Sequence, residues 1–145
     1  MDLTFRPFVD EDFELLKSWF DDPKMGRWLE YPTRVWFDYA RSTPNVYGWM
    51  ICEGDLPVGY IHMDTEAGKI GYPSIAVRPD KHGQGYGRKI LRDLLARPEV
   101  SRLERLEGDV ERGNIASEHC VTAAGFRPVT DQYDADGLRR FVYSR

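Results

Sequence analysis

Residues 75–91 read Ile-Ala-Val-Arg-Pro-Asp-Lys-His-Gly-Gln-Gly-Tyr-Gly-Arg-Lys-Ile-Leu, and the rest of the chain is organised around this stretch. Its first three residues predict a buried strand, which Pro79 ends. Alternating glycines then form a turn, after which an amphipathic helix begins. The first N–H groups of a helix lack partners inside the helix and carry partial positive charge. A strand, a glycine turn and a helix in this order therefore predict an anion-binding site.

The glycines in this stretch favour a phosphate as the anion. Without Cβ atoms, Gly83, Gly85 and Gly87 let a phosphate approach the backbone amides, and they permit positive φ angles. Positive charge at the same end of the helix comes from Lys81, Arg88 and Lys89. We therefore expect a phosphorylated ligand here.

Two other phosphate motifs fit this stretch poorly. A nucleoside-triphosphate loop needs Ser or Thr after its Lys to hold magnesium, but Ile90 follows Lys89. A dinucleotide motif needs its third glycine one residue later, where this chain has Arg88. Glu107 or Asp109 could still hold a ribose, so a nicotinamide-binding domain stays open as an alternative. A strand-to-helix turn without any ligand stays open as well.

Residues 82–87 resemble the acetyl-coenzyme A loop of the GNAT superfamily of N-acetyltransferases, which has the pattern [QR]-x-x-G-x-[GA] between a strand and a helix. This chain has His82 at the first position, where it can donate a hydrogen bond but carries a pH-dependent charge. The resemblance implies that the coenzyme is bound by His82, Gly83, Gln84, Gly85, Tyr86, Gly87 and Arg88.

A second segment resembles the other GNAT motif, N-x-A-S followed by G-F. It runs from Asn114 to Phe126 and predicts a helix with Asn114 as N-cap and Gly125 at its end. One face of this helix is expected to hold Ala116, Cys120 and Ala123. The two motifs stand at the separation found in the family, with a strand near 106–110 between them. In element order the resemblance covers the whole chain.

The resemblance implies a mixed α/β (α+β) fold, a single acetyltransferase domain over residues 1–145. We expect a mostly antiparallel sheet of six to seven strands with about four helices, and with the fourth and fifth strands splayed apart. The fourth strand, 69–77, contains Pro73, which cannot donate a hydrogen bond to a neighbouring strand. In the family the gap admits the pantetheine arm of the coenzyme, and the contacts implied here are backbone groups of Ile75, Ala76 and Val77.

The N-terminal part fits the same layout. Residues 3–8 predict a strand, and Asp10 is a suitable N-cap for the helix that follows. Residues 25–39 are rich in aromatic side chains and include Glu30 and Asp38. In a GNAT-like layout this region covers the acceptor, although helix packing is the favoured explanation for any single aromatic residue.

The reaction implied is direct transfer of acetyl from acetyl-coenzyme A to a primary amine of a small molecule or a protein N-terminus. In the family, the residue at Asn114 hydrogen-bonds the pantetheine, and a tyrosine seven residues later often acts as the acid. Here that residue is Val121. Ser117 remains as the candidate acid, because the ribosomal-protein-type branch, which this chain also resembles beside the aminoglycoside-type branch, gives its serine the thiol-facing role. Packing at the helix start is the alternative for Ser117.

The general base is not identified by the sequence. Branch members often carry Glu before Ile-Gly-Tyr, but this chain has Lys69, which is protonated at neutral pH. The candidates that remain are Asp64, Glu66, Glu30, Tyr72 and His62. Because the usual Tyr and Glu are both missing, a catalytically weak module that binds coenzyme A or acyl-coenzyme A is the alternative function.

Composition limits the other functions. A chain of 145 residues with formal net charge −4 fits one globular domain and argues against nucleic-acid binding. No apolar stretch approaches membrane-spanning length, so we expect a cytoplasmic protein that does not bind membranes. Cys52 and Cys120 are expected as free thiols, and the neighbours His119 and Cys120 do not have metal-ligand spacing. We therefore expect no metal. The many aromatic residues are compatible with a homodimer.

Overall fold

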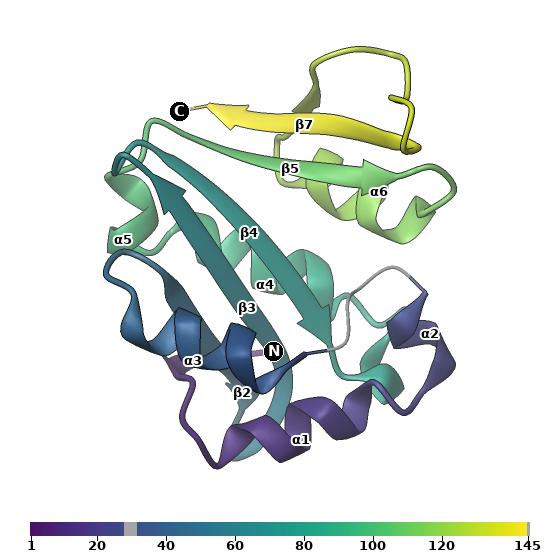
Figure 1. Ribbon diagram of the computed structural model, residues 1–145. Coiled ribbons are helices and arrows are strands. Elements are labelled where there is room, and N and C mark those ends of the chain that lie inside the picture. Colours follow the sequence, from purple (N-terminus) through teal and green to yellow (C-terminus); the bar gives the residue numbers. More distant parts are fainter. Residues whose placement is uncertain (28–31, 145) are drawn as a thin grey trace. The chain divides into compact units, whose positions relative to one another are not determined.

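The computed structural model describes residues 1–27 and 32–144 and contains a mixed seven-stranded sheet (Figure 1). The strand order is β1-β2-β3-β4-β5-β7-β6, and β4 and β5 run parallel. The pairs β1–β2, β2–β3, β5–β7 and β6–β7 are antiparallel, which confirms the predicted mostly antiparallel sheet. The strands are β1 Thr4–Pro7, β2 Tyr47–Glu53, β3 Leu56–Glu66, β4 Ile70–Val77, β5 Arg105–Glu111, β6 Arg127–Pro128 and β7 Leu138–Ser144.

Within the described residues, four α-helices of eight to ten residues accompany the sheet, as predicted. They are α1 Asp12–Trp19, α3 Arg34–Ser42, α4 Tyr86–Leu95 and α6 Ile115–Ala123. Three shorter helices each begin with proline, which suits the first helical position because the N–H that it lacks would have no helical partner there. These are α2 Pro23–Gly26, the 3-10 helix η1 Pro79–Lys81 and α5 Pro98–Ser101.

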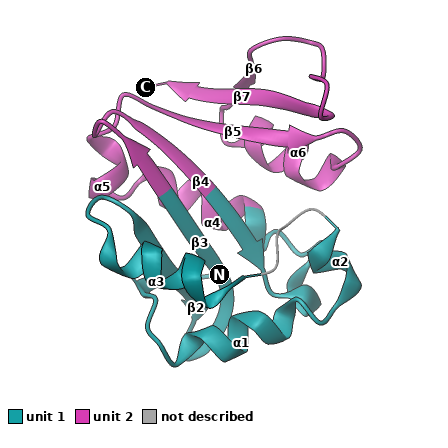
Figure 2. Cartoon of the chain, viewed as in Figure 1, with its two compact units in different colours: residues 1–63, 74–87 teal, residues 64–73, 88–145 magenta. Residues whose placement is uncertain are grey.

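The chain forms two compact units that interleave along the sequence (Figure 2). The first unit comprises residues 1–63 and 74–87, and the second comprises residues 64–73 and 88–145. The chain changes units within β3–β4 and within α4, so neither unit is a continuous segment. A single acetyltransferase domain over residues 1–145 remains a prediction.

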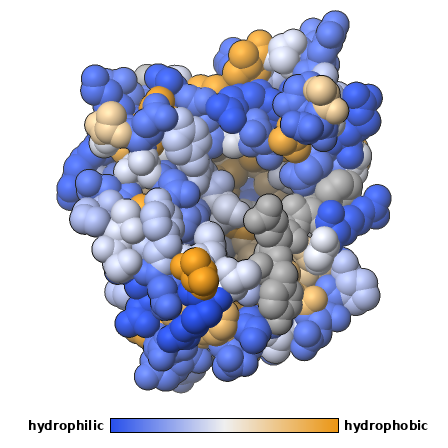
Figure 3. All heavy atoms as spheres, viewed as in Figure 1, coloured by the Kyte–Doolittle hydropathy of each residue, from blue (hydrophilic) through white to orange (hydrophobic). Residues whose placement is uncertain are grey.

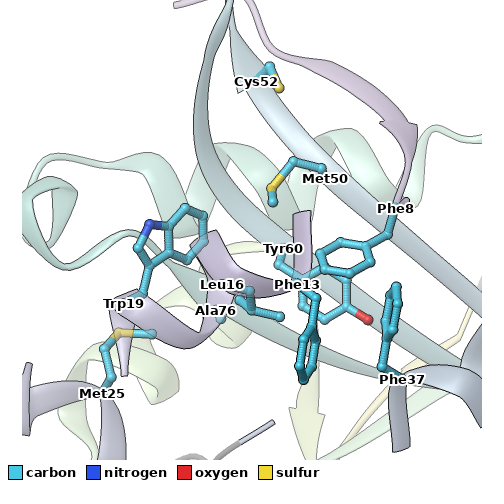
Figure 4. Packing of buried hydrophobic residues seen from close by; sticks show 10 residues of the cluster. All are labelled: Phe8, Phe13, Leu16, Trp19, Met25, Phe37, Met50, Cys52, Tyr60 and Ala76. Carbon is cyan, nitrogen blue, oxygen red and sulfur yellow. The ribbon is translucent and has the colours of Figure 1, made fainter. Parts of the chain in front are cut away.

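The core of the first unit is largely aromatic (Figure 4). Phe8 packs against Phe37 and Tyr60 with ring centroids 4.7 and 4.6 Å apart, and Phe13 stacks on Phe37 at 5.3 Å. Full burial of one such side chain contributes about 1.5–3 kcal/mol to folding. The other members of this cluster come from α1, α2 and strands β2–β4: Leu16, Trp19, Met25, Met50, Cys52 and Ala76.

The start of α1 differs from the prediction that Asp10 is its N-cap. The helix begins at Asp12, whose buried carboxylate accepts two hydrogen bonds from Arg6, at 2.7 and 2.8 Å, and one from the Val9 N–H at 3.0 Å. Although burial acts in the opposite direction, these bonds hold the pKa of Asp12 below its usual value. Asp10 instead forms ion pairs with Arg34 and Arg41 of α3. The start of α1 is therefore held by Asp12, an acid in the first turn with half-buried Arg6 beside it, and not by a side chain at the N-cap position.

The second unit is built on the antiparallel pairing of β5 with β7, which extends over all seven residues of each strand. Leu106, Val110 and Phe141 are buried on it. The end of α6 is confirmed as predicted: Gly125 adopts φ +101°, and its N–H bonds the Thr122 carbonyl. The next N–H, of Phe126, bonds the Val121 carbonyl, which completes a Schellman motif and returns Phe126 to the core.

β6 pairs antiparallel with β7 but comprises only Arg127–Pro128. Its long connection to β7 is organised by Asp134. One carboxylate oxygen of Asp134 accepts hydrogen bonds from the Asp136 and Leu138 N–H groups, both at 2.9 Å. The Gly137 N–H bonds the Asp134 carbonyl at 3.0 Å. Asp-Gly therefore forms the turn directly before β7.

The surface seen in Figure 3 is mostly hydrophilic, with hydrophobic residues scattered over it. The most exposed large hydrophobic residue described is Val35 on α3, at 81%. Among the described residues, no helix combines the length and the apolar character needed to cross a bilayer.

Candidate active site

The segment that follows β4, residues 78–87, includes the first two residues of α4 and is called the phosphate loop below. Gly83 and Gly85 adopt φ +74° and +89°, as the alternating glycines predict. A Cβ atom at either position would meet no other atom within 4 Å, so open space lies in front of this backbone. The loop therefore has what a phosphate needs: left-handed turns that only glycine adopts easily, and room to approach the chain.

Two polar side chains of the phosphate loop are directed at carbonyls of the same region. His82 Nε2 lies 2.7 Å from the Val77 carbonyl oxygen, and Gln84 Nε2 donates to the Asp80 carbonyl at 2.8 Å. Because a carbonyl only accepts, Nε2 of His82 carries the hydrogen. These side chains fix the loop backbone internally. The predicted contact of His82 with the coenzyme stays a prediction.

The charges near the loop differ in their surroundings. Lys81 Nζ lies 5.6 Å from the centre of the Tyr86 ring. Lys89 forms an ion pair with Asp93, one turn further along α4, at 2.9 Å. Arg88 is exposed and belongs to the second unit. Lys89 is therefore partly neutralised, and Lys81 and Arg88 remain the cations expected to attract a phosphate.

The end of β4 leads directly into the loop. Ala76 is buried in the aromatic core of the first unit, whereas Ile75 and Val77, which alternate with it, are only half-buried. β4 pairs with β5 at only two positions, Ile70 with Arg105 and Gly71 with Leu106. By comparison, β5 and β7 form seven residue pairs. Pro73 lies two residues beyond the last of these β4–β5 pairs. A short parallel ladder of this kind is what the predicted splaying of the two strands requires.

The start of α6 brings Asn114 and Ser117 together in the second unit. Asn114 Oδ1 accepts a hydrogen bond from the Ser117 N–H at 3.3 Å, which confirms Asn114 as the N-cap. Its amide nitrogen donates to Glu111 Oε2 at 3.3 Å. The Ser117 hydroxyl is half-buried and makes no hydrogen bond to the residues that the structure describes. It is therefore available to a ligand.

Ala116, Cys120 and Ala123 share a face of α6 by their spacing, but this is not the least exposed face of the helix. Ala116 and Ala123 are exposed. The less exposed face carries residues spaced by three and four positions, namely Ser117, Cys120, Val121 and Ala124. Burial raises the pKa of the Cys120 thiol, so this group stays protonated at neutral pH.

An ionic cluster on β5 and β7 was not predicted from the sequence. Buried Glu107 accepts from Arg105 at 2.6 Å and from Arg140 at 2.9 Å, and Arg140 also donates to Asp109 at 2.9 and 3.0 Å. The hydrogen bond from Arg105, followed by that from Arg140, holds the pKa of Glu107 low. Charged residues at every second position, 105, 107 and 109, were the available signal for an ionic cluster on this strand. The β7 partner of Glu107 and Asp109, Arg140, is distant in the sequence.

The candidate bases lie in different surroundings. The Tyr72 hydroxyl donates to Glu66 Oε1 at 3.4 Å, and desolvation together with the charge of Glu66 raises the pKa of Tyr72. His62 is buried on β3 beneath Trp36, with ring centroids 4.8 Å apart. Asp64, two residues further along that strand, is half-buried. Glu30, like Trp28 and Tyr31 of the predicted aromatic region, lies outside the described residues.

Neither a disulfide nor a metal-binding cluster is found among the cysteines and possible metal ligands of the described residues. Cys52 and Cys120 are free thiols, as predicted. Over residues 1–27 and 32–144, no three His, Cys, Asp or Glu side chains are grouped so that they could hold a metal ion.

Comparison with known proteins adds a family match to this geometry. Residues 2–127 match the family described as "Acetyltransferase (GNAT) domain". The chain is also 25% identical over 140 residues to the uncharacterized N-acetyltransferase YfmK of Bacillus subtilis (strain 168). That similarity covers 95% of this chain and 94% of YfmK.

Solved structures share the fold over nearly the whole chain. The aminoglycoside acetyltransferase AAC(6')-Ib, crystallised with coenzyme A and kanamycin, matches with a TM-score of 0.79 at 18% identity, over 99% of this chain and 95% of its own. Spermidine N-acetyltransferase from Vibrio cholerae, crystallised with coenzyme A and spermine, matches with a TM-score of 0.79 at 14% identity, over 98% and 95%.

Proposed function

This chain belongs to the GNAT family of N-acetyltransferases, and from that premise we propose that it transfers acetyl directly from acetyl-coenzyme A to a primary amine. Acetyl-coenzyme A is the donor typical of the family. The observation that carries the proposal is the phosphate loop, in which Gly83 and Gly85 turn with positive φ and leave open space before the backbone. Such a loop at the start of a ten-residue helix suits a pyrophosphate.

The donor-binding roles are assigned residue by residue. The amides of Gly83, Gly85 and Gly87 would receive the pyrophosphate, with Arg88 adding charge. Backbone groups of 75–77 would pair with the pantetheine, and one of their N–H groups would donate to the thioester oxygen as negative charge develops there. Asn114 would hydrogen-bond the pantetheine with its amide nitrogen while its oxygen continues to cap α6.

Acetyl-coenzyme A supplies a thioester carbon that an amine nitrogen attacks, with a thiolate as leaving group. We assign Ser117 as the donor of a proton or hydrogen bond to that thiolate, because its hydroxyl is half-buried and makes no bond to another described residue. Cys120, one turn further on, keeps its proton at neutral pH because burial raises its pKa. The side chain of Val121 offers no proton.

The amine must lose a proton, since a free alkylamine has a pKa of about 10. Glu107 is unsuited as the base because two arginines lower its pKa and therefore its basicity. Tyr72, whose pKa is raised, is a donor at neutral pH rather than an acceptor. Glu66, which accepts the Tyr72 hydroxyl, is the base candidate that these contacts favour, acting directly or through water.

The acceptor class follows from the neighbours and from charge. The two structural neighbours carry amine-bearing molecules, kanamycin and spermine, and the net charge of −4 favours a cationic acceptor. We propose a small-molecule primary amine first and a protein N-terminus second. A coenzyme-binding module without turnover is the competing function, favoured by Val121 and Lys69 at positions where the family often has Tyr and Glu.

Release of free thiol from acetyl-coenzyme A tests the proposal. The panel contains an aminoglycoside, a polyamine, an amino acid and a peptide with a free N-terminus. We expect amine-dependent thiol release with at least one of them and acetylated product by mass spectrometry. Coenzyme A binding without turnover on any amine would instead support the binding module, and the absence of both would contradict either function.

A further inference from the structure

Tyr86, the first residue of α4, is anchored in an unusual way for a residue between two loop glycines. Its side chain is buried, with 7% exposed, and its hydroxyl donates to Glu53 Oε1 at 2.6 Å. This hydrogen bond raises the pKa of Tyr86, so the phenol keeps its proton and acts as donor at neutral pH. A bond of this length to a carboxylate is a strong, charge-assisted one. The start of α4 is therefore tied to the last residue of β2.

The other end of the phosphate loop is tied to the same hairpin. The Arg78 N–H bonds the Val58 carbonyl at 2.8 Å, and its guanidinium bonds the Pro57 carbonyl at 3.3 Å. Glu53 ends β2, and Pro57 and Val58 lie at the start of β3. All of these residues belong to the first unit. The β2–β3 hairpin thus holds both ends of the loop, by backbone contacts at Arg78 and by one side-chain pair at Tyr86.

This arrangement has a consequence for the amides of the loop. A helix start presents its N–H groups to a ligand only if the first turn keeps its rotation and position. Gly83 and Gly85 do not provide rigidity, since glycine has the largest conformational freedom of all residues. Tyr86 is the one residue between Gly85 and Gly87, and its contact with Glu53 limits that freedom.

We propose that Glu53 and Tyr86 are positioning residues for the donor: Glu53 fixes Tyr86, and Tyr86 fixes the amides that receive the pyrophosphate. The inference rests on the proposed function of the phosphate loop. Neither side chain needs to touch the coenzyme. The pair restricts the unliganded loop to the binding geometry, so less ordering is required when the ligand binds.

Calorimetry with coenzyme A on the intact protein tests this pair. Tyr86→Phe keeps the buried ring and removes only the hydroxyl, while Glu53→Ala removes the acceptor. We expect each to weaken coenzyme A binding about tenfold, as the loss of one charge-assisted hydrogen bond implies. The double variant is expected to be no weaker than either single one, because both break the same contact. Glu53→Gln keeps an acceptor oxygen and should restore most of the affinity.

The matched control is Tyr47→Phe in the same unit. Tyr47 is half-buried and stacks on Trp49 with ring centroids 5.2 Å apart, so its substitution removes an equivalent hydroxyl away from the loop. Its affinity for coenzyme A is expected to match the wild type. In turnover, Tyr86→Phe should raise the KM for acetyl-coenzyme A and leave both kcat and the KM for the amine within twofold.

A purely structural role would give a different pattern. If Tyr86→Phe and Glu53→Ala lower the melting temperature but leave the coenzyme A affinity unchanged, the positioning role is overturned while the proposed function stands. The positioning role would also be overturned if the losses of coenzyme A affinity in the two single variants multiplied in the double variant. A change in the KM for the amine alone would overturn it as well. Failure of the wild type to bind coenzyme A would overturn both proposals together.

Discussion

The phosphate loop and the start of α6 are built on different principles. The loop offers backbone amides, so its chemistry depends on where glycine lets the chain turn. The start of α6 offers side chains, so each role there depends on one residue type. This chain keeps the loop glycines of its family but has Val121 where the family often has a tyrosine. Donor binding should therefore be most sensitive to changes at the loop glycines, whereas catalysis should be most sensitive to single side chains at the start of α6.

The largest effect is expected where backbone geometry is disturbed. Gly85→Val places a β-branched residue at φ +89° and a side chain in the space before the amides. The strain should cost about 1–3 kcal/mol of stability, and the lost amide contacts should weaken coenzyme A binding at least about 100-fold. Calorimetry and the KM for acetyl-coenzyme A measure it.

Gly137→Val is the control for that strain. Gly137 also has positive φ, +78°, with no atom within 4 Å of a Cβ, but it lies in the turn before β7. It should lose comparable stability and keep its coenzyme affinity. Equal loss of affinity in the two variants would show that strain alone, not the loop amides, is responsible.

A smaller effect is expected at the start of α6, and it concerns kcat and not the affinity for coenzyme A. Ser117→Ala removes the hydroxyl that we assign to the leaving thiolate and should lower kcat about 10- to 100-fold, with the KM for acetyl-coenzyme A little changed. Ser101→Ala on α5, whose hydroxyl bonds the Pro98 carbonyl, serves as the control. An unchanged kcat in Ser117→Ala would leave Ser117 with only a packing role.

Asn114 has both a structural and a binding role in this account. Its side-chain oxygen caps α6, and its amide nitrogen is assigned to the pantetheine of acetyl-coenzyme A. Asn114→Asp keeps the capping oxygen and loses the amide, whereas Asn114→Ala loses both. Asn114→Ala should lose about 1 kcal/mol of folding free energy through the lost cap, whereas Asn114→Asp should lose stability only through repulsion from Glu111, and both should bind coenzyme A several-fold more weakly. If Asn114→Asp bound coenzyme A as tightly as the wild type, the role of Asn114 would be helix capping alone.

The smallest effect concerns Glu107. Its pKa is held low in the folded protein, while an unfolded glutamate has a pKa of about 4.3. The unfolded state therefore takes up the proton first as the pH falls, and the contribution of Glu107 to stability declines below about pH 4.5. Glu107→Gln should lose about 1 kcal/mol at neutral pH and show a flatter decline in urea unfolding between about pH 5 and pH 3. An unchanged decline would contradict the pairing.

The sequence predicts the backbone-built parts of this molecule well. Glycine turns, the cap at Asn114 and the Schellman turn at Gly125 follow from local conformational preferences, and the structure has them as predicted. Contacts between distant residues were missed. The start of α1 is held by Asp12 and not by Asp10, because Arg6 hydrogen-bonds Asp12. The bonds of Glu107 to Arg140 and of Tyr86 to Glu53 join residues more than 30 positions apart.

Affinity for coenzyme A compared with pantetheine is the most direct test of the central claim. Pantetheine keeps the thiol arm and lacks the pyrophosphate together with the phosphorylated adenosine. If the amides of the phosphate loop hold the pyrophosphate, calorimetry should give coenzyme A an affinity at least about 100-fold above that of pantetheine, and Gly85→Val should remove most of that difference. Equal affinities for the two ligands, or no binding of coenzyme A at millimolar concentration, would contradict it.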